Sequence, residues 1–142
     1  MSVDLQTART IIGAARARAR AKNFNPLTVV VLDVGGNVVA AEREDGSSNK
    51  RFDIAFGKAH GALALGMGSR ALMARAEQQA YFVAAVTAAI GGALIPVPGG
   101  VLVRDREGTL LGAVGVSGDT SDNDEAAAVA GIEAADLVAQ PD

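Results

Sequence analysis

An eight-residue apolar run that ends in a tight-turn signal is the feature that most constrains the fold. Residues 27–34 read LTVVVLDV, so β-branched residues dominate the run and one acidic residue interrupts it. Such a run is typical of a central strand that is covered on both faces. Gly35-Gly36-Asn37 follows and favours a tight hairpin. Residues 38–44 then supply the partner strand, so the sequence predicts an antiparallel pair at this point.

A second hairpin and several helices are expected from the remaining pattern. Apolar residues that recur at spacings of three and four indicate amphipathic helices, and β-branched runs around a turn indicate strands. Ser121 with Asp124 resembles a capping box, with Asp in place of the usual Glu or Gln, at the start of the last helix. The expected helices cover residues 4–22 and 50–66, two pieces within 69–90, and 121–138, and the expected strands cover 101–104 and 109–116.

Hairpins that lie between helices favour an α+β fold over a parallel, doubly wound one. We expect about five strands in an antiparallel sheet with helices on its faces. A chain of 142 residues is about one domain, which we assign to residues 1–142. Gly57 and Gly61 lie four residues apart in the second helix, where glycine is costly. This spacing predicts the close approach of another backbone or of a flat ligand.

Composition excludes several kinds of site. The chain has no cysteine, which excludes disulfides and thiolate chemistry, and His60 is its one histidine, which excludes a zinc site with two histidines from one chain. A net charge of −3 disfavours a nucleic-acid partner. The N-terminus does not resemble a secretory signal, and no uninterrupted membrane span stands out. We therefore expect a cytoplasmic protein without a membrane partner.

The second expected helix carries two candidate ligand-binding residues, Lys58 and His60. Because Asp53 precedes His60 by seven residues, the two share a helix face, and the carboxylate is placed to orient the imidazole. The alternative for Lys58 is a solvated surface charge. The alternative for His60 is a half-buried histidine with ordinary hydrogen bonds.

The other candidates lie in turns or at strand ends, and each also has a structural explanation. The segment with Gly115, Ser117 and Gly118 precedes a helix, and exposed amides at a helix start can hold a ligand oxygen. The acidic residues that follow it disfavour a phosphate there, and helix capping explains most of them without a hard cation. The candidates are Arg43 and Asp45, for which a surface ion pair is the alternative, Gly99 and Gly100 in a loop, and Gly115, Ser117 and Gly118.

Read in order, these stretches resemble one family. The matching segments are residues 30–36, 43–46, 58–59, 99–100, 108 with 112–118, 124–125 and 130–131. The set is similar to the haem-degrading or haem-binding family typified by GlcG and HbpS, whose module also forms the C-terminal domain of PduO-type corrinoid adenosyltransferases. The resemblance covers nearly the whole chain, although each segment alone is a weak signal.

The resemblance implies a profilin-like α/β/α sandwich, homo-oligomers and, in some members, haem. It also implies that Lys58, Arg43, Asp45 and residues 115–118 line one region. The chain departs from the family pattern at Leu102, where Pro is usual, and at Asn123, where Gln is frequent. His60 stands where a small or hydroxyl residue is common, and it would supply a haem-iron ligand. Weaker iron-ligand candidates are Met67, Met73 and Tyr81.

Three functions therefore stay open at this point. The first is a haem-binding or haem-handling protein, against which the small number of aromatic residues counts. The second is a binding protein or enzyme for a small organic acid or related metabolite that uses Lys58, Arg43 and Asp45, with Lys58 as general acid or electrostatic clamp. The third is an oligomeric accessory or sensory module. The sequence does not decide whether a reaction is catalysed.

Overall fold

A computed structural model describes residues 1–142 and contains five helices and five strands. The strands form one antiparallel sheet in the order β2-β1-β4-β3-β5, which confirms the expected α+β class. The elements are α1 (Leu5–Ala21), β1 (Thr28–Asp33), β2 (Val38–Arg43), α2 (Arg51–Leu65), α3 (Ser69–Gln78), α4 (Ala80–Ala89), β3 (Gly100–Arg104), β4 (Leu110–Ser117), α5 (Ser121–Ala134) and β5 (Val138–Gln140).

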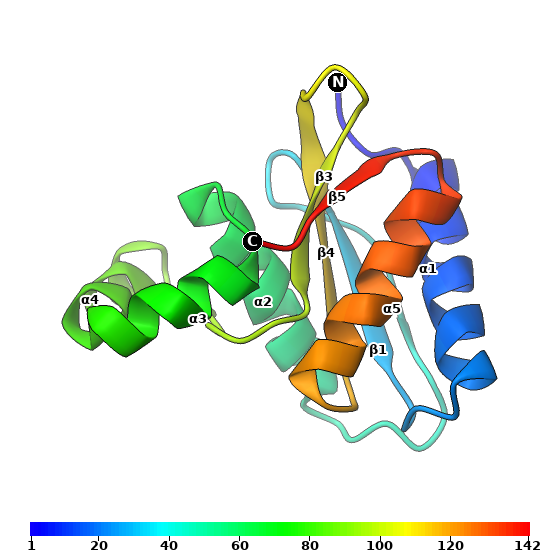
Figure 1. The fold of residues 1–142 in the computed structure, drawn as a ribbon, viewed down its shortest axis with the longest axis horizontal. Helices are drawn as coiled ribbons and strands as arrows, with labels where there is room; N and C mark the ends of the chain where they lie inside the picture. Colours follow the sequence, from blue (N-terminus) through cyan, green and yellow to red (C-terminus); the bar gives the residue numbers. More distant parts are fainter.

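The elements form three layers, with α1 and α5 on one face of the sheet and α2 on the other (Figure 1). Strand β1 shows why its sequence is apolar on both faces. Val29 and Val31 join the core under α1 and α5, whereas Val30 and Leu32 join a separate core under α2. Burial on both faces explains why residues 29–32 are all apolar. The arrangement is the expected α/β/α sandwich.

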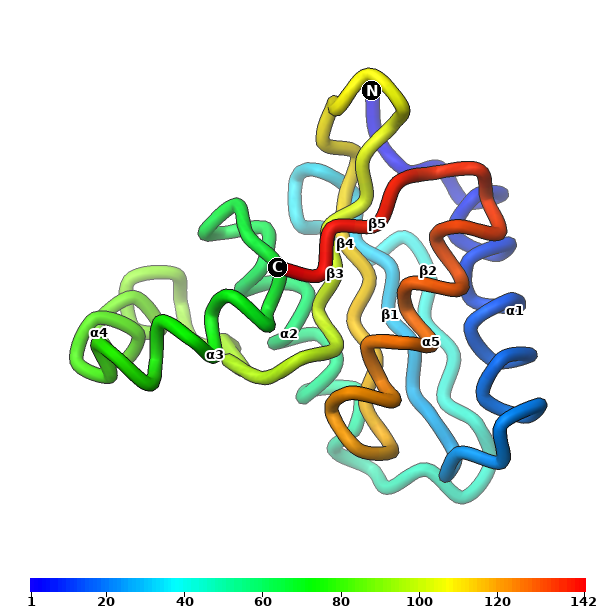
Figure 2. The backbone as a smooth tube through the Cα atoms, viewed as in Figure 1, coloured from blue at the N-terminus to red at the C-terminus, as the bar shows by residue number.

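Helices α3 and α4 extend sideways from the sandwich, as the green segment in Figure 2 shows. They have a small core of their own, built on Leu72, Val83 and Leu94. The chain then returns along α2, where residues 93–95 pack against two glycines of the helix. A Cβ atom on Gly57 would lie 2.6 Å from Ile95 Cγ1, and one on Gly61 would lie 2.9 Å from Leu94 Cγ. The glycine spacing therefore marks the close approach of another segment.

The C-terminal helix begins at Ser121 as expected, but the expectations for its end and for its cap are wrong. Helix α5 ends at Ala134, and Asp136 takes a left-handed conformation with a φ of 59°. Residues Val138–Gln140, of which Val138 was expected to end the helix, form edge strand β5 beside β3. The N-cap is Thr120, whose side chain accepts a hydrogen bond from the Asn123 N–H. Asp124 does not complete a capping box, because it points inward to a lysine.

No helix in the structure combines the length and the apolar character needed to cross a membrane.

Candidate functional site

A buried ion pair joins α2 to the start of α5 at the end of β4. Lys58 Nζ donates hydrogen bonds to Asp124 Oδ2 at 3.0 Å and to the Val116 carbonyl at 2.9 Å. Both charged side chains are 2% exposed. Burial lowers the pKa of Lys58 and raises the pKa of Asp124, and the attraction between the two charges opposes both changes. Lys58 is therefore not a solvated surface charge.

The glycines of the candidate site allow α2 to lie directly on β3 and β4. A Cβ atom on Gly100 would lie 2.2 Å from the Lys58 carbonyl oxygen, and one on Gly115 would lie 1.9 Å from the Ala55 carbonyl oxygen. A Cβ atom on Gly99 would lie 2.8 Å from Lys58 Nζ. Side chains at these positions would separate the helix from the sheet. The glycines thus explain how a long charged side chain fits under α2.

Gly118, in the loop that follows β4, packs against a different segment, the loop that precedes β1. Its φ is 159°, and a Cβ atom there would lie 2.2 Å from the Pro26 carbonyl oxygen. The neighbouring Asp119 accepts hydrogen bonds from the Asn25 N–H at 2.7 Å and from Asn123 Nδ2 at 2.7 Å. The loop that follows β4 is therefore tied to the loop that precedes β1.

These hydrogen bonds make Asp119 a source of acid sensitivity. The Asn25 N–H is the largest cause that lowers the pKa of Asp119, followed by the Asn123 side chain and the Thr120 N–H. A native pKa below the unfolded value stabilises the fold above about pH 4, and this stability is lost as the pH falls through the native pKa. Asp119→Ala should therefore lose less stability than wild type between about pH 4 and about pH 2. Urea unfolding of both proteins at both pH values measures how much unfolding free energy each loses. Equal losses in Asp119→Ala and wild type would contradict the assignment.

A row of polar side chains crosses three strands beside the first residue of α2. Arg43 and Ser117 are the cross-strand partners of Thr28 on either side. Thr28 Oγ1 and Ser47 Oγ lie 3.0 Å apart, and Arg43 Nη1 donates to the Ser47 carbonyl at 2.8 Å. Arg51 Nη1 donates to Ser117 Oγ at 3.0 Å. We call these five residues, Thr28, Arg43, Ser47, Arg51 and Ser117, the strand-end cluster.

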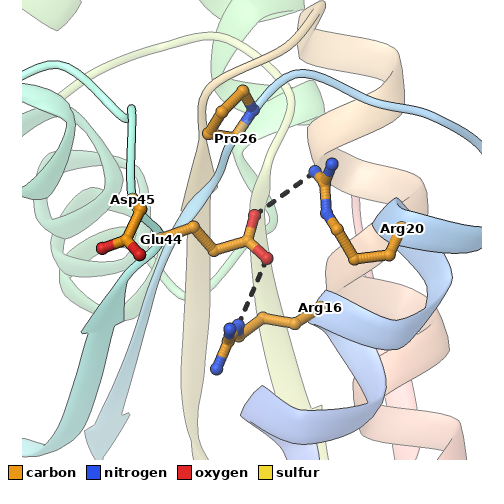
Figure 3. Close-up of a pocket in the computed structure, with 5 residues that line it drawn as sticks. All are labelled: Arg16, Arg20, Pro26, Glu44 and Asp45. Atoms are coloured by element: carbon orange, nitrogen blue, oxygen red, sulfur yellow. Dashed lines mark hydrogen bonds and ion pairs between the residues drawn. The ribbon is translucent and has the colours of Figure 1, made fainter.

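Asp45 lies in a different pocket and forms no ion pair with Arg43. In this pocket Glu44 is buried and binds Arg16 Nε at 3.2 Å and Arg20 Nη2 at 3.3 Å. The carboxylate of Asp45 points away from both guanidinium groups (Figure 3). Arg16 and Arg20 share one face of α1, and only the position of β2 shows that this face meets Glu44. No hydrogen bond or ion pair thus joins Asp45 to Arg43 or Lys58.

His60 lies apart from the buried lysine, beside the turn between β1 and β2. Its half-buried ring stacks on Phe56 with ring centroids 5.3 Å apart and an interplanar angle of 11°. Phe56 in turn stacks on Phe52 at 6.1 Å. One cavity meets the histidine, and its other lining residues are Val34, Gly35, Gly36, Leu63 and Ala64.

The hydrogen-bond partner of His60 is a backbone carbonyl rather than the expected carboxylate. His60 Nε2 lies 3.3 Å from the Ile90 carbonyl oxygen, while Asp53 pairs with Lys50 at 3.5 Å. The prediction that Asp53 orients the imidazole is therefore wrong. The prediction did not consider that exposed Lys50, three residues before Asp53, competes for the carboxylate.

The weaker iron-ligand candidates lie on or beside the α3–α4 pair, and none of them lines the cavity beside His60. Met67 packs against the small core of that pair. Met73 is half-buried on α3, and Tyr81 on α4 is 73% exposed.

The layers and the glycine-packed helix place the chain among α+β sandwiches with an open antiparallel sheet. More specifically, the chain belongs to the haem-degrading HbpS-like protein family, whose model matches residues 3–133. This confirms the resemblance that the ordered motifs indicate. No curated protein sequence matches the chain.

Solved structures share this fold over nearly the full chain. A PduOC–haem complex superposes with a TM-score of 0.85 at 22% identity and covers 96% of this chain and 97% of its own, a likeness of fold alone. Protein ORFY of Klebsiella pneumoniae is 27% identical, with a TM-score of 0.84 over 94% of this chain and 90% of its own. A double mutant of HbpS from Streptomyces reticuli is 27% identical, with a TM-score of 0.79 over 94% of this chain and 86% of its own.

Proposed function

We propose that residues 1–142 act as one haem-binding domain in which His60 would supply a nitrogen ligand to the iron. The observation that carries this proposal is the hydrogen bond at His60. Because the Ile90 carbonyl can only accept, Nε2 carries the proton and donates. The lone pair of the neutral imidazole is then on Nδ1, which has no hydrogen-bond partner in the structure. A backbone carbonyl on one ring nitrogen is the usual support for a histidine that binds a metal through the other.

The surroundings of His60 also suit a flat, largely apolar group. Phe52 and Phe56 continue the aromatic stack along α2, and both are accessible, Phe52 with 36% of its surface exposed. Because these rings are nearly parallel to the imidazole, they would meet a porphyrin bound by His60 through their edges, in the edge-to-face contact that aromatic rings also favour. Membership of a haem-degrading family and the likeness to a PduOC–haem complex support haem as the group. Haem would supply a redox-active iron, and we assign no catalytic step to the chain.

A haem titration followed by visible absorption tests this proposal. Wild type should give a saturable Soret shift, and His60→Ala should bind at least about tenfold more weakly, since even outer partners of a ligand contribute tenfold or more. Met73→Leu, which changes a weaker ligand candidate, should bind as wild type does. An unchanged Soret shift and midpoint in His60→Ala would overturn the assignment.

The expected assembly into homo-oligomers belongs to the same proposal. The exposed surface of α4 supports it, because this ten-residue helix has no charged residue and buries only Val83. Analytical ultracentrifugation of the haem-free protein measures the assembly, and a monomer at all concentrations would contradict it.

A further inference from the structure

The strand-end cluster holds two arginines that have no acidic partner. Neither Arg43 nor Arg51 takes part in any ion pair of the structure, and their hydrogen bonds go to neutral oxygens, the Ser47 carbonyl and the Ser117 hydroxyl. By contrast, Arg16 and Arg70 each contact two carboxylates. The nearby cation Lys58 is already neutralised by Asp124. Two positive charges of the cluster are therefore not neutralised by any ion pair of the structure.

The hydroxyl groups behind the two arginines also have unused hydrogens. Thr28, Ser47 and Ser117 are 1%, 6% and 0% exposed. The hydrogen bond between Thr28 and Ser47 uses one of their two hydroxyl hydrogens. Ser117 accepts from Arg51 and donates to no acceptor in the structure. Each of these oxygens has at least one hydrogen-bond partner, and the remaining hydroxyl hydrogens are free to turn toward an oxygen-rich anion.

We propose that the strand-end cluster binds a small organic acid, with the carboxylate held by Arg43 and Arg51 in front of the hydroxyl row. The planar fork of a guanidinium matches the two oxygens of a carboxylate, and such charge-assisted bonds are the strong ones. Arg43 is exposed and Arg51 is partly exposed, so both remain within reach of a ligand. No internal ion pair has to break for the carboxylate to bind.

This site differs from the organic-acid site expected from the sequence. Lys58 is held inside by Asp124, and Asp45 lies in the other pocket, so neither contributes. Arg51 takes their place as the second cation. The site does not use the proposed iron ligand, because His60 follows Arg51 by nine residues, about 14 Å along the helix axis.

Titration with sodium malonate at constant ionic strength, followed by NMR of the arginine Nε–H signals, tests the proposal. Wild type should show saturable shifts at Arg43 and Arg51. Arg51→Gln and Arg43→Gln should each raise the Kd for malonate at least about tenfold, as expected when a forked charge-assisted bond is lost. Arg104→Gln is the matched control, because Arg104 also lacks a carboxylate partner but lies on β3. Its Kd should equal that of wild type.

Three results would overturn the proposal. The first is the absence of saturable shifts in wild type, and the second is an equal Kd in wild type and in both cluster variants that melt as wild type does. The third is tighter binding of inorganic phosphate than of malonate, which would show that the cluster does not select a carboxylate. His60→Ala should bind malonate as wild type does, so failure of the haem proposal leaves this test intact.

Discussion

Asp124→Asn is expected to lower the free energy of unfolding by about 3–5 kcal/mol, as is usual when one partner of a buried ion pair is removed. The reason is that Lys58 then lacks its counter-charge in the interior, where both side chains are only 2% exposed in the wild type. Its remaining strong partner is the Val116 carbonyl, which is neutral. Urea unfolding at neutral pH measures the loss.

The double variant Lys58→Met/Asp124→Leu is the control for this effect. It removes both charges and fills the space with apolar groups, so it should recover much of the lost stability, apart from the hydrogen bond that Asp124 Oδ1 accepts from the Asp119 N–H at 2.9 Å. The pKa directions agree with this expectation, since burial disfavours the charged form of both partners. A double variant that is as unstable as Asp124→Asn would contradict the account, as would a single variant within about 1 kcal/mol of wild type.

Gly115→Ala is expected to cost about 3 kcal/mol or more, at the upper end of what overpacking costs. The added methyl would lie 1.9 Å from the Ala55 carbonyl oxygen. Backbone of α2 cannot yield as a flexible side chain does, so the helix must move off β4. That movement would also disturb the Lys58–Asp124 pair, which depends on the same contact. Thermal and urea unfolding measure the loss.

Gly13→Ala is the matched control. Gly13 lies within α1 with nothing within 4 Å of an added Cβ atom. The substitution should raise the stability by about 0.5–1 kcal/mol, because alanine favours the helix. Equal effects of the two substitutions would show that the contact between α2 and β4 is looser than described.

The sheet and most helices were predictable because their signals are local. The apolar run at residues 28–33 can be buried on both faces only as a central strand. Gly66 ends α2 in the left-handed conformation that glycine favours. Strand β5 was not predictable, since it has three residues and pairs with β3 across a long sequence separation. The apolar residues of this segment continue a helical pattern equally well.

The candidate site was only partly predictable for the same reason. Lys58 and the glycines of β3 and β4 were identified, and the structure brings them together. Asp124 was not recognised as the partner of Lys58, because its position at a helix start is explained equally well by capping. Arg51 was missed because only the packing of α2 against β4 shows that Ser117 lies beside it. Long-range pairing of side chains leaves no periodic signal in the sequence.

The single histidine allows the haem proposal to be tested at one atom. Protein labelled with ¹⁵N-histidine contains one labelled ring, that of His60, and diamagnetic zinc protoporphyrin serves as the probe. The account predicts that Nδ1 shifts strongly and saturably while the proton stays on Nε2. Nitrogen signals that do not move on addition of the porphyrin would contradict it.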